Sequence, residues 1–245
     1  MSMVFDLSLL QLLSFEIGTD CNLKSAHDNC PINYIKRPKN KPTLTVEKIC
    51  EAVHHANDLK FDGYVAFHHY NEPLMYIKQI SQVIQKLPNN RFLLWSNGLL
   101  IPHIERLGYS LDMFDKIILT CYDEKNRDLL NRVKDRHRDV VINSAKMDER
   151  VEIYESKYEN LVACKKVFLE IPIDHYGEVA LCTHDWKNTY RLGNIIETSL
   201  YDVISSERYQ NMLAMAKKIK LQPGAPDICR NCQFSYLTYN PKAEE

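Results

Sequence analysis

The chain has 245 residues, of which 45% are hydrophobic and 26% are charged, and its formal net charge is −1. This composition predicts a packed globular core, built as one large domain or as one domain with a small appendage. The near-neutral charge gives no electrostatic reason to expect a nucleic-acid partner. No apolar run reaches the roughly 18 residues of a membrane span, and the apolar stretch 3–13 lacks the features of a signal peptide. We therefore expect a cytoplasmic protein without a membrane partner.

Strands and helices are predicted to alternate through the first two thirds of the chain. We expect strands at 10–17, 63–69, 91–96, 116–120 and 139–143, and helices at 45–59, 73–87, 100–107, 123–136 and around 149–159. Thr45 is a suitable N-cap for the first helix. This alternation predicts parallel βα units that form a partial or full barrel, in which ligands bind at the carboxyl ends of the strands.

The pattern changes after about residue 161. A hairpin is predicted with strands at 166–172 and 178–182 and a turn at 175–177, followed by one or two helices within 199–218. This last part is too short for a conventional core, so we expect a bound metal to help hold it. The sequence thus predicts a barrel domain at 1–160 and a small second domain at 161–245.

Four of the eight cysteines lie in the second part of the chain, at Cys164, Cys182, Cys229 and Cys232. In a reducing compartment, grouped cysteines favour metal binding over disulfides. The last two form a CxxC pair, which brings two thiolates within reach of one metal centre. Four thiolates suit either a zinc ion or a four-iron cluster, and buried structural thiols are the plain alternative. Cys50 and Cys121 fit no cluster spacing, so we expect them to be core or strand-end thiols.

The tail also resembles a known extension. The segments CKKVFLEIPIDHYGEVALCTHDWKNTYRLGNI, SLYDVISSERYQ and CRNC are similar to the C-terminal SPASM/twitch region of radical S-adenosylmethionine (SAM) enzymes. The residues that follow the family pattern in order are Cys164, Gly177, Cys182, Asp185, Gly193, Asn194, Cys229 and Cys232. The resemblance implies an auxiliary [4Fe-4S] cluster on the four cysteines. It implies the shorter, single-cluster twitch form, because no cysteine follows Cys232.

The barrel half carries further resemblances. The stretch GYVAFHHYNEPLM is similar to the strand-two motif Gly-Gly-Glu-Pro of the family, and LLWSNGLLI is similar to its strand-three turn. In the family, the strand-two turn offers acceptors to the ammonium group of SAM, a cation with three donors. The residues implied to contact SAM are Tyr70, Asn71, Glu72, Pro73, Ser96, Asn97, Thr120, Tyr122 and Asn143. Ordinary strand ends are the alternative interpretation for each of them.

The loop CNLKSAHDNC stands where the family has Cys-x3-Cys-x2-Cys. Three ligands there hold a [4Fe-4S] cluster whose fourth iron binds SAM. One alignment puts the missing cysteines at Ser25 and Asp28. A second keeps three ligands, as Cys21, His27 and Cys30, and histidine does replace cysteine in some iron–sulfur centres, where it raises the reduction potential. We favour the second, and the alternatives are assembly through Cys21, Cys30 and another group, or loss of the cluster.

The resemblance as a whole implies an α/β fold, with a partial barrel of radical SAM type and a twitch-like extension. The implied activity is cleavage of SAM to a 5′-deoxyadenosyl radical, which removes hydrogen from a substrate C–H bond, with oxidation of a small alcohol or sugar as one outcome. A reducing donor such as flavodoxin or ferredoxin is implied. Peptide modification and a non-catalytic binding protein that has lost its cluster are the alternatives. No catalytic residue is assigned, and the candidates by residue type alone are His68, His69, His175 and His184.

Overall fold

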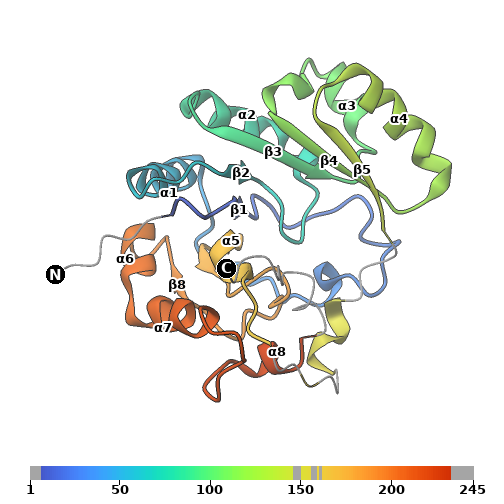
Figure 1. Cartoon of the computed structure of the whole chain (residues 1–245). Coiled ribbons are helices and arrows are strands. Elements are labelled where there is room, and N and C mark those ends of the chain that lie inside the picture. The colour runs from blue at the N-terminus through green and yellow to red at the C-terminus, as the bar shows by residue number, and fades with distance from the viewer. Residues whose placement is uncertain (1–6, 146–149, 156–158, 160–161, 233–245) are drawn as a thin grey trace.

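The computed structural model describes residues 7–145, 150–155, 159 and 162–232 (Figure 1). The helix expected around 149–159 lies partly outside these residues. Within them, Arg150–Tyr154 forms a short 3-10 helix, η5. No helix among the described residues has both the length and the apolar character that a membrane crossing requires.

The described strands form one open sheet in the order β5-β4-β3-β2-β1-β6-β7-β8. Its parallel part contains β1 (Leu12–Phe15), β2 (Tyr64–Ala66), β3 (Arg91–Ser96), β4 (Lys116–Cys121), β5 (Val140–Ser144) and β6 (Glu170–Ile173). The predicted strand–helix alternation and the α/β class are confirmed, and the sheet is a partial rather than a closed barrel. The carboxyl ends of β1–β5 therefore lie along one edge, as parallel pairing requires.

Helices cover one face of this sheet in the barrel half (Figure 1). They are α1 (Val46–Asp58), α2 (Ile77–Lys86), α3 (Ile101–Arg106) and α4 (Arg127–Arg136), and the 3-10 turns are η1 (Pro31–Asn33), η2 (Pro73–Tyr76), η3 (Leu111–Met113) and η4 (Glu124–Asn126). Thr45 caps α1 as predicted, because its side chain accepts a bond from the amide of Lys48 at 3.2 Å. Apolar residues on the inner faces of α1, α2 and α4, such as Ile49, Ile80 and Leu130, are fully buried. Their spacing creates the apolar helix faces that pack on the sheet.

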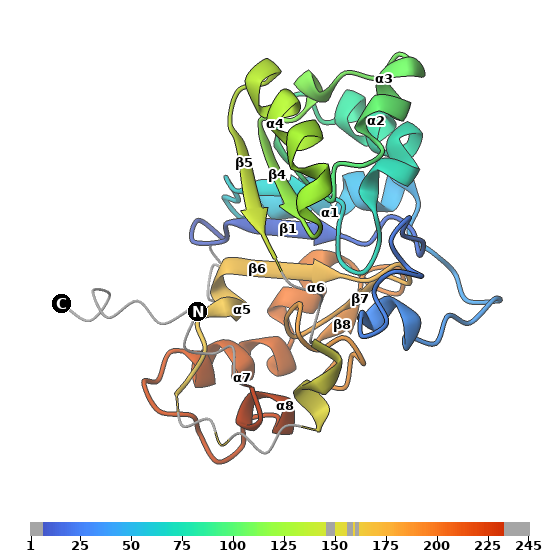
Figure 2. The ribbon, with the colours of Figure 1, turned by 90° about the vertical axis from the view of Figure 1, so that its right-hand side faces the viewer.

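The tail contains α5 (Lys166–Leu169), β7 (Glu178–Val179), β8 (Gly193–Asn194), α6 (Leu200–Ser205), α7 (Glu207–Ala216) and α8 (Asp227–Arg230), and Figure 2 shows it beneath β6. The prediction of a strand at 166–169 is wrong, because these residues form α5. A strand needs a hydrogen-bonded neighbour, and β1, the neighbour of β6, begins only at Leu12, opposite Glu170. The hairpin turn is correct, since Gly177 adopts φ +76°, which glycine tolerates.

The strand β6 pairs in parallel with β1 and antiparallel with β7, so the tail and the barrel half share one continuous sheet. This arrangement brings the segment between Cys164 and Cys182 against the inner side of the barrel half. The division at residue 160 stays a prediction about domain organisation. The shared sheet has a direct consequence for the site, because residues of the tail reach the same cavity as the strand ends.

Candidate functional site

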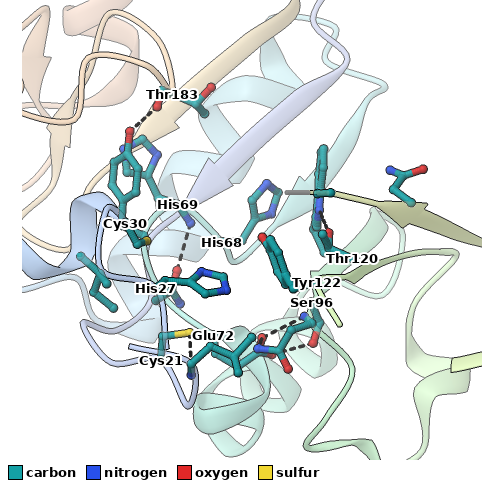
Figure 3. A pocket seen from close by; sticks show the side chains of 18 of the residues that line it. Cys21, His27, Cys30, His68, His69, Glu72, Ser96, Thr120, Tyr122 and Thr183 are labelled. Carbon is teal, nitrogen blue, oxygen red and sulfur yellow. Dashed lines mark hydrogen bonds between the residues drawn. The ribbon is translucent and has the colours of Figure 1, made fainter. Parts of the chain in front are cut away.

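A cavity of about 400 Å³ lies at the carboxyl ends of the parallel strands (Figure 3), and we call it the main cavity. Its volume is within the range of small-molecule sites. Of the residues predicted to bind a cluster or SAM in the barrel half, Cys21, His27, Cys30, Tyr70, Asn71, Glu72, Ser96, Asn97, Thr120, Tyr122 and Asn143 all line it. Pro73 is buried at the start of η2 and is not among its lining residues. The fold thus gathers residues that are spread over more than 120 positions of the sequence.

The cysteine loop is attached to the barrel at its beginning. The phenol oxygen of Tyr76, at the end of η2, accepts bonds from the amides of Thr19 and Asp20 at 3.0 Å each. The Tyr76 ring lies so close to Gly18 that a Cβ atom there would come within 1.9 Å of it. Only glycine fits at this position, so the break between the first strand and the cysteine loop is fixed by packing as well as by hydrogen bonds.

Within the loop, the three ligand candidates face the main cavity, whereas the other two aligned positions do not. His27 is buried, at 6% exposure, and its ring packs edge-on against Tyr122 at 4.5 Å between centroids. Ser25 and Asp28 are exposed. Figure 3 shows the His27 ring in the same part of the cavity as the Cys21 and Cys30 side chains. The geometry therefore favours the set with histidine over the alignment through positions 25 and 28.

The surroundings of Cys21 in this loop disfavour a thiolate that has no bound cation. Burial raises the pKa of Cys21 to about 11, and the nearby Glu72 and Cys30 add to the shift. A thiolate in such a place needs a compensating cation, and iron supplies one when it binds. The residues present thus fit a cluster chemically.

Glu72 organises the strand-two and strand-three turns. Its carboxylate is 2% exposed and accepts bonds from the Ser96 hydroxyl at 2.7 Å, the Asn97 side-chain amide at 2.7 Å, and the backbone amides of Asn97 and Leu74 at 3.1 Å each. Burial raises its pKa, and these bonds oppose the increase. A carboxylate has about four acceptor positions, and the protein uses four. An ammonium group placed here would have to replace one of these donors.

Asn97 extends the Glu72 network to the cysteine loop. Its side-chain nitrogen also donates to the Asn22 oxygen at 2.8 Å, and Asn22 directly follows Cys21. The sequence pattern did not single out Asn22, although its neighbour was a predicted ligand. One continuous set of bonds therefore joins the strand-two motif, the strand-three turn and the cysteine loop.

Tyr70 connects the barrel half to the tail. Its hydroxyl donates to the backbone carbonyl of Thr183, the residue after Cys182, and its side chain is 3% exposed. In Figure 3 this bond is drawn at the side of the cavity where His69 lies. The family motif has glycine at this position, and glycine carries no group that could make the bond.

Sequence reasoning missed part of the cavity wall. Trp95, Lys166, Glu170 and Thr183 also line it. Trp95 donates through its indole nitrogen to the Thr120 hydroxyl at 3.0 Å, and Lys166 forms an ion pair with Glu170 at 2.8 Å. Of the histidines that were candidates by type, His68, His69 and His184 line the cavity, whereas His175 does not.

The four cysteines of the tail meet at a second site. Cys164, Cys182, Cys229 and Cys232 line one small cavity, which we call the cysteine cavity. Burial raises the pKa of Cys229 to about 12, and Cys232 and Cys164 contribute to the shift. Burial likewise raises the pKa of Cys182, with a contribution from Cys229. All four thiols thus border one small space, and Lys166 and His184 line both this cavity and the main cavity.

Cys50 and Cys121 are buried, as expected of core thiols. Among the described residues, no three His, Cys, Asp or Glu side chains are grouped closely enough for a single metal ion. A cluster needs ligands that are farther apart than those of one ion, because each thiolate binds a different iron.

Below the main cavity, a buried ion pair ties the segment after the cysteine loop to β1. The Arg37 guanidinium donates two bonds of 2.7 Å to the carboxylate of Glu16, which is 0% exposed. The amides of Tyr70 and His175 donate to the same carboxylate at 3.2 and 3.1 Å. Burial alone would raise the pKa of Glu16, but the bonds and charge of Arg37 outweigh burial and lower it. Four segments therefore converge on one carboxylate.

A cysteine loop after the first strand, an open sheet that is mainly parallel, and a four-cysteine tail are the features that the sequence predicts, and three comparisons with known proteins bear on them. The model of the SPASM family, described as an iron–sulfur cluster-binding domain, matches residues 164–233. The crystal structure of BtrN in complex with AdoMet and 2-DOIA superposes with a TM-score of 0.71 at 21% identity, covering 92% of this chain and 93% of that one. The structure of BtrN in an open conformation gives 0.61 at 19% identity, covering 92% of each chain.

A curated relative also matches nearly the whole chain. It is the S-adenosyl-L-methionine-dependent 2-deoxy-scyllo-inosamine dehydrogenase of Niallia circulans, 20% identical over 238 residues, which are 91% of this chain and 93% of the relative. These matches confirm the predicted fold and the predicted SPASM-type region of the tail. The family model also favours iron–sulfur over zinc for the four cysteines.

Proposed function

We propose that the protein is a radical SAM dehydrogenase that oxidises a small, sugar-like alcohol. The observation that carries this proposal is the union of three residue sets around adjoining cavities: the loop ligands, the strand-end residues and the tail cysteines. The similarity to a SAM-dependent dehydrogenase over nearly all of both chains supports the same reaction class.

In the main cavity, Cys21, His27 and Cys30 would hold a [4Fe-4S] cluster, with SAM beside it. When bound, this pair of cofactors supplies a 5′-deoxyadenosyl radical, together with the electron that forms it, and this radical removes a hydrogen atom from the substrate. The residues of the protein would orient SAM and the substrate and enclose them. Glu72 holds the side chains of Ser96 and Asn97 in place, and both of these residues line the cavity.

The strand ends on the far side would complete the SAM site. Thr120, Tyr122 and Asn143 line that side of the cavity, and Trp95 fixes the Thr120 hydroxyl. A SAM molecule between these residues and the loop would be enclosed largely by protein. Exclusion of water matters here, because a carbon radical must be kept from side reactions.

In the tail, Cys164, Cys182, Cys229 and Cys232 would hold the auxiliary [4Fe-4S] cluster. Oxidation of an alcohol to a ketone removes one hydrogen atom from carbon, one proton from the hydroxyl group and one further electron, for which the auxiliary cluster is an acceptor. A substrate beside Lys166 and His184 would lie between the two cofactors, because these residues border both cavities. The partners we propose are a small-molecule substrate and a one-electron donor.

The test is anaerobic reconstitution followed by iron and sulfide analysis, reduction with dithionite, addition of SAM and assay of 5′-deoxyadenosine. We expect about eight irons per chain, as two four-iron clusters require. His27→Ala should lower the count to about four and abolish 5′-deoxyadenosine, whereas Ser25→Ala, at an exposed position of the same loop, should change neither.

Zinc without iron, or about four irons and no 5′-deoxyadenosine in the native chain, would refute the proposal. The second result would leave a binding protein without its SAM-cleaving cluster. The substrate class is tested separately with 2-deoxy-scyllo-inosamine and related cyclitols, by detection of the ketone. If deuterium is transferred into 5′-deoxyadenosine from a labelled peptide and from no labelled cyclitol, the substrate class is a peptide rather than an alcohol.

A further inference from the structure

A second large cavity, of about 530 Å³, lies outside the proposed active site, and we call it the outer cavity. It is lined by three segments, 34–41, 174–178 and 186–191, together with Val151 and Glu155. Its positively charged lining residues are Lys36, Arg37, Lys41, Lys187 and Arg191, and Lys39 is exposed next to them. The acidic lining residues are Glu155, Asp174 and Glu178. Nothing in the proposed chemistry uses these charges.

The charges are distributed unequally between the depth of the outer cavity and its rim. Glu178 has a side chain that is only 9% exposed, and it pairs with both Lys41 at 2.7 Å and Arg191 at 3.2 Å. In contrast, Lys36, Lys39 and Lys187 are exposed and take part in no ion pair among the described residues. Glu155 is exposed as well, but the charged groups of the outer cavity that meet the solvent are mainly cations, although the net charge of the whole chain is −1.

The lysine segment is connected to the cysteine loop within a few residues. Cys30 lines the main cavity and Tyr34 lines the outer cavity, with the single turn η1 between them. The segment is then held by Arg37, which is paired with Glu16, and by the Tyr176 hydroxyl, which donates to the Pro38 carbonyl at 3.1 Å. Figure 2 shows this blue segment beside the turn between β6 and β7.

The other side of the outer cavity is connected to the auxiliary site. Trp186 and Lys187 follow Cys182 by a few residues, and the Lys187 ammonium lies 5.0 Å from the Trp186 ring. Trp186 in turn lies 6.1 Å from the ring of Tyr34, measured between centroids. The exposed cations and an aromatic pair thus lie on two segments that each begin four residues after a predicted ligand, Cys30 or Cys182, and that meet at the contact between Tyr34 and Trp186.

We propose that the basic surface, defined by Lys36, Lys39, Lys41, Lys187 and Arg191, is the docking site for an acidic one-electron donor protein of the flavodoxin or ferredoxin type. This inference rests on the proposed function, because reductive cleavage of SAM consumes an electron that must enter from outside. Complementary charge accelerates encounter and orients the partner, and its effect depends on ionic strength. A donor seated here would contact the segments 34–41 and 186–191, which begin four residues after Cys30 and Cys182 in the sequence.

The test compares two electron sources in the same reconstituted protein. Flavodoxin, reduced by its reductase and NADPH, is the protein donor, and dithionite is the small donor. Lys36→Glu/Lys39→Glu changes two exposed residues of the basic surface. Lys78→Glu/Lys86→Glu makes the same charge change on exposed positions of α2 and serves as the control.

We expect the surface variant to lower flavodoxin-driven formation of 5′-deoxyadenosine about tenfold or more at low salt, with the difference shrinking as salt is added. Dithionite-driven formation should be unchanged, and the α2 variant should resemble the native chain with both donors. In direct binding measurements, the native chain should bind flavodoxin with an affinity that falls with salt, and the surface variant should bind more weakly.

Equal effects of the two variants, or an equal loss with dithionite, would overturn the docking proposal. The docking proposal would also be overturned if the native chain bound neither flavodoxin nor a plant-type ferredoxin. It would be overturned as well if this surface bound an acidic peptide instead. If the native chain yields no 5′-deoxyadenosine even with dithionite, the proposed function fails, and the binding measurement still decides whether the surface recognises an acidic carrier.

Discussion

Replacing Arg37 with methionine tests the interactions that hold the segment after the cysteine loop. Arg37 donates two bonds of 2.7 Å to Glu16, whose side chain is 1% exposed. Methionine keeps most of the aliphatic contact and removes the charge and both bonds. The carboxylate of Glu16 would then retain only the backbone amides of Tyr70 and His175 as donors.

Removal of one partner of a buried ion pair costs about 3–5 kcal/mol, because the other charge stays buried without compensation. Two donors remain here, and the Arg37 side chain is 20% exposed, which allows water to reach the carboxylate. We therefore expect Arg37→Met to lower the free energy of unfolding by about 3 kcal/mol. For a chain of this size the melting temperature would fall by roughly 6–12 °C. Urea denaturation of the cluster-free protein under reducing conditions measures the free energy directly.

The loss should depend on pH in a defined direction. In the native chain the folded-state pKa of Glu16 is lowered, so its contribution is present above the ordinary value of 4.5 and is lost as the pH falls through the folded-state pKa. In Arg37→Met, burial would dominate and raise that pKa, so protonation would relieve the penalty as the pH falls. The difference between the two proteins should be largest near neutral pH and smaller at about pH 5. An equal difference at both values would refute this reasoning.

The double variant Glu16→Gln/Arg37→Met is the matched control. It removes the buried charge together with its partner, so it should be more stable than Arg37→Met alone. If it is no more stable, the effect of Arg37 comes from packing rather than from the carboxylate.

Three further substitutions test the site and its frame. His27→Cys should keep the iron content and lower the reduction potential of the proposed cluster, measured by redox titration, because a thiolate replaces a neutral imidazole; a higher potential would contradict histidine ligation. Gly98→Ala should lower the free energy of unfolding by more than about 1 kcal/mol, because φ is +76° and the new Cβ would lie 2.6 Å from Leu130, and an unchanged urea midpoint would contradict this. Tyr70→Phe should lower the free energy of unfolding by about 1 kcal/mol, because it removes the hydrogen bond to Thr183. In hydrogen exchange, the loss of protection should extend into the tail. Changes in protection that are confined to the barrel half would contradict the link.

The local parts of the fold were predictable from the sequence. The strand Arg91–Ser96 follows from its content of residues that favour β-strands. The cap at Thr45 follows from a hydroxyl group directly before an amphipathic stretch. Each of these signals depends only on residues that are neighbours in the sequence. The pairing of β6 with β1 was not predicted, because it joins residues about 160 positions apart. The helical turn Lys166–Leu169 was missed for the same reason, since its strand-like pattern lacks a partner strand.

The candidate site was predictable on the side that carries motifs. His27 and Glu72 were singled out by the resemblance of their loops to motifs of the radical SAM family, and both line the main cavity. Lys166 and Glu170 were not singled out, because only the parallel addition of β6 to β1 brings them to the cavity. The one available signal for them was their position between two predicted ligands, Cys164 and Cys182, whereas His184, two residues after Cys182, was a candidate by residue type alone.

Two of the departures from the pattern of the similar family can be understood together. The strand-two motif has Tyr70 where the family has glycine, and the cysteine loop has His27 where a thiol would be usual. The Tyr70 hydroxyl reaches the carbonyl after Cys182, and the Tyr70 amide bonds to Glu16, which Arg37 holds beside the end of the cysteine loop. The residue that replaces glycine therefore links both cysteine-bearing segments. The Tyr70 hydroxyl thus adds a side-chain link between the strand-two turn and the tail to the backbone pairing of β1 with β6, and glycine could not supply that link.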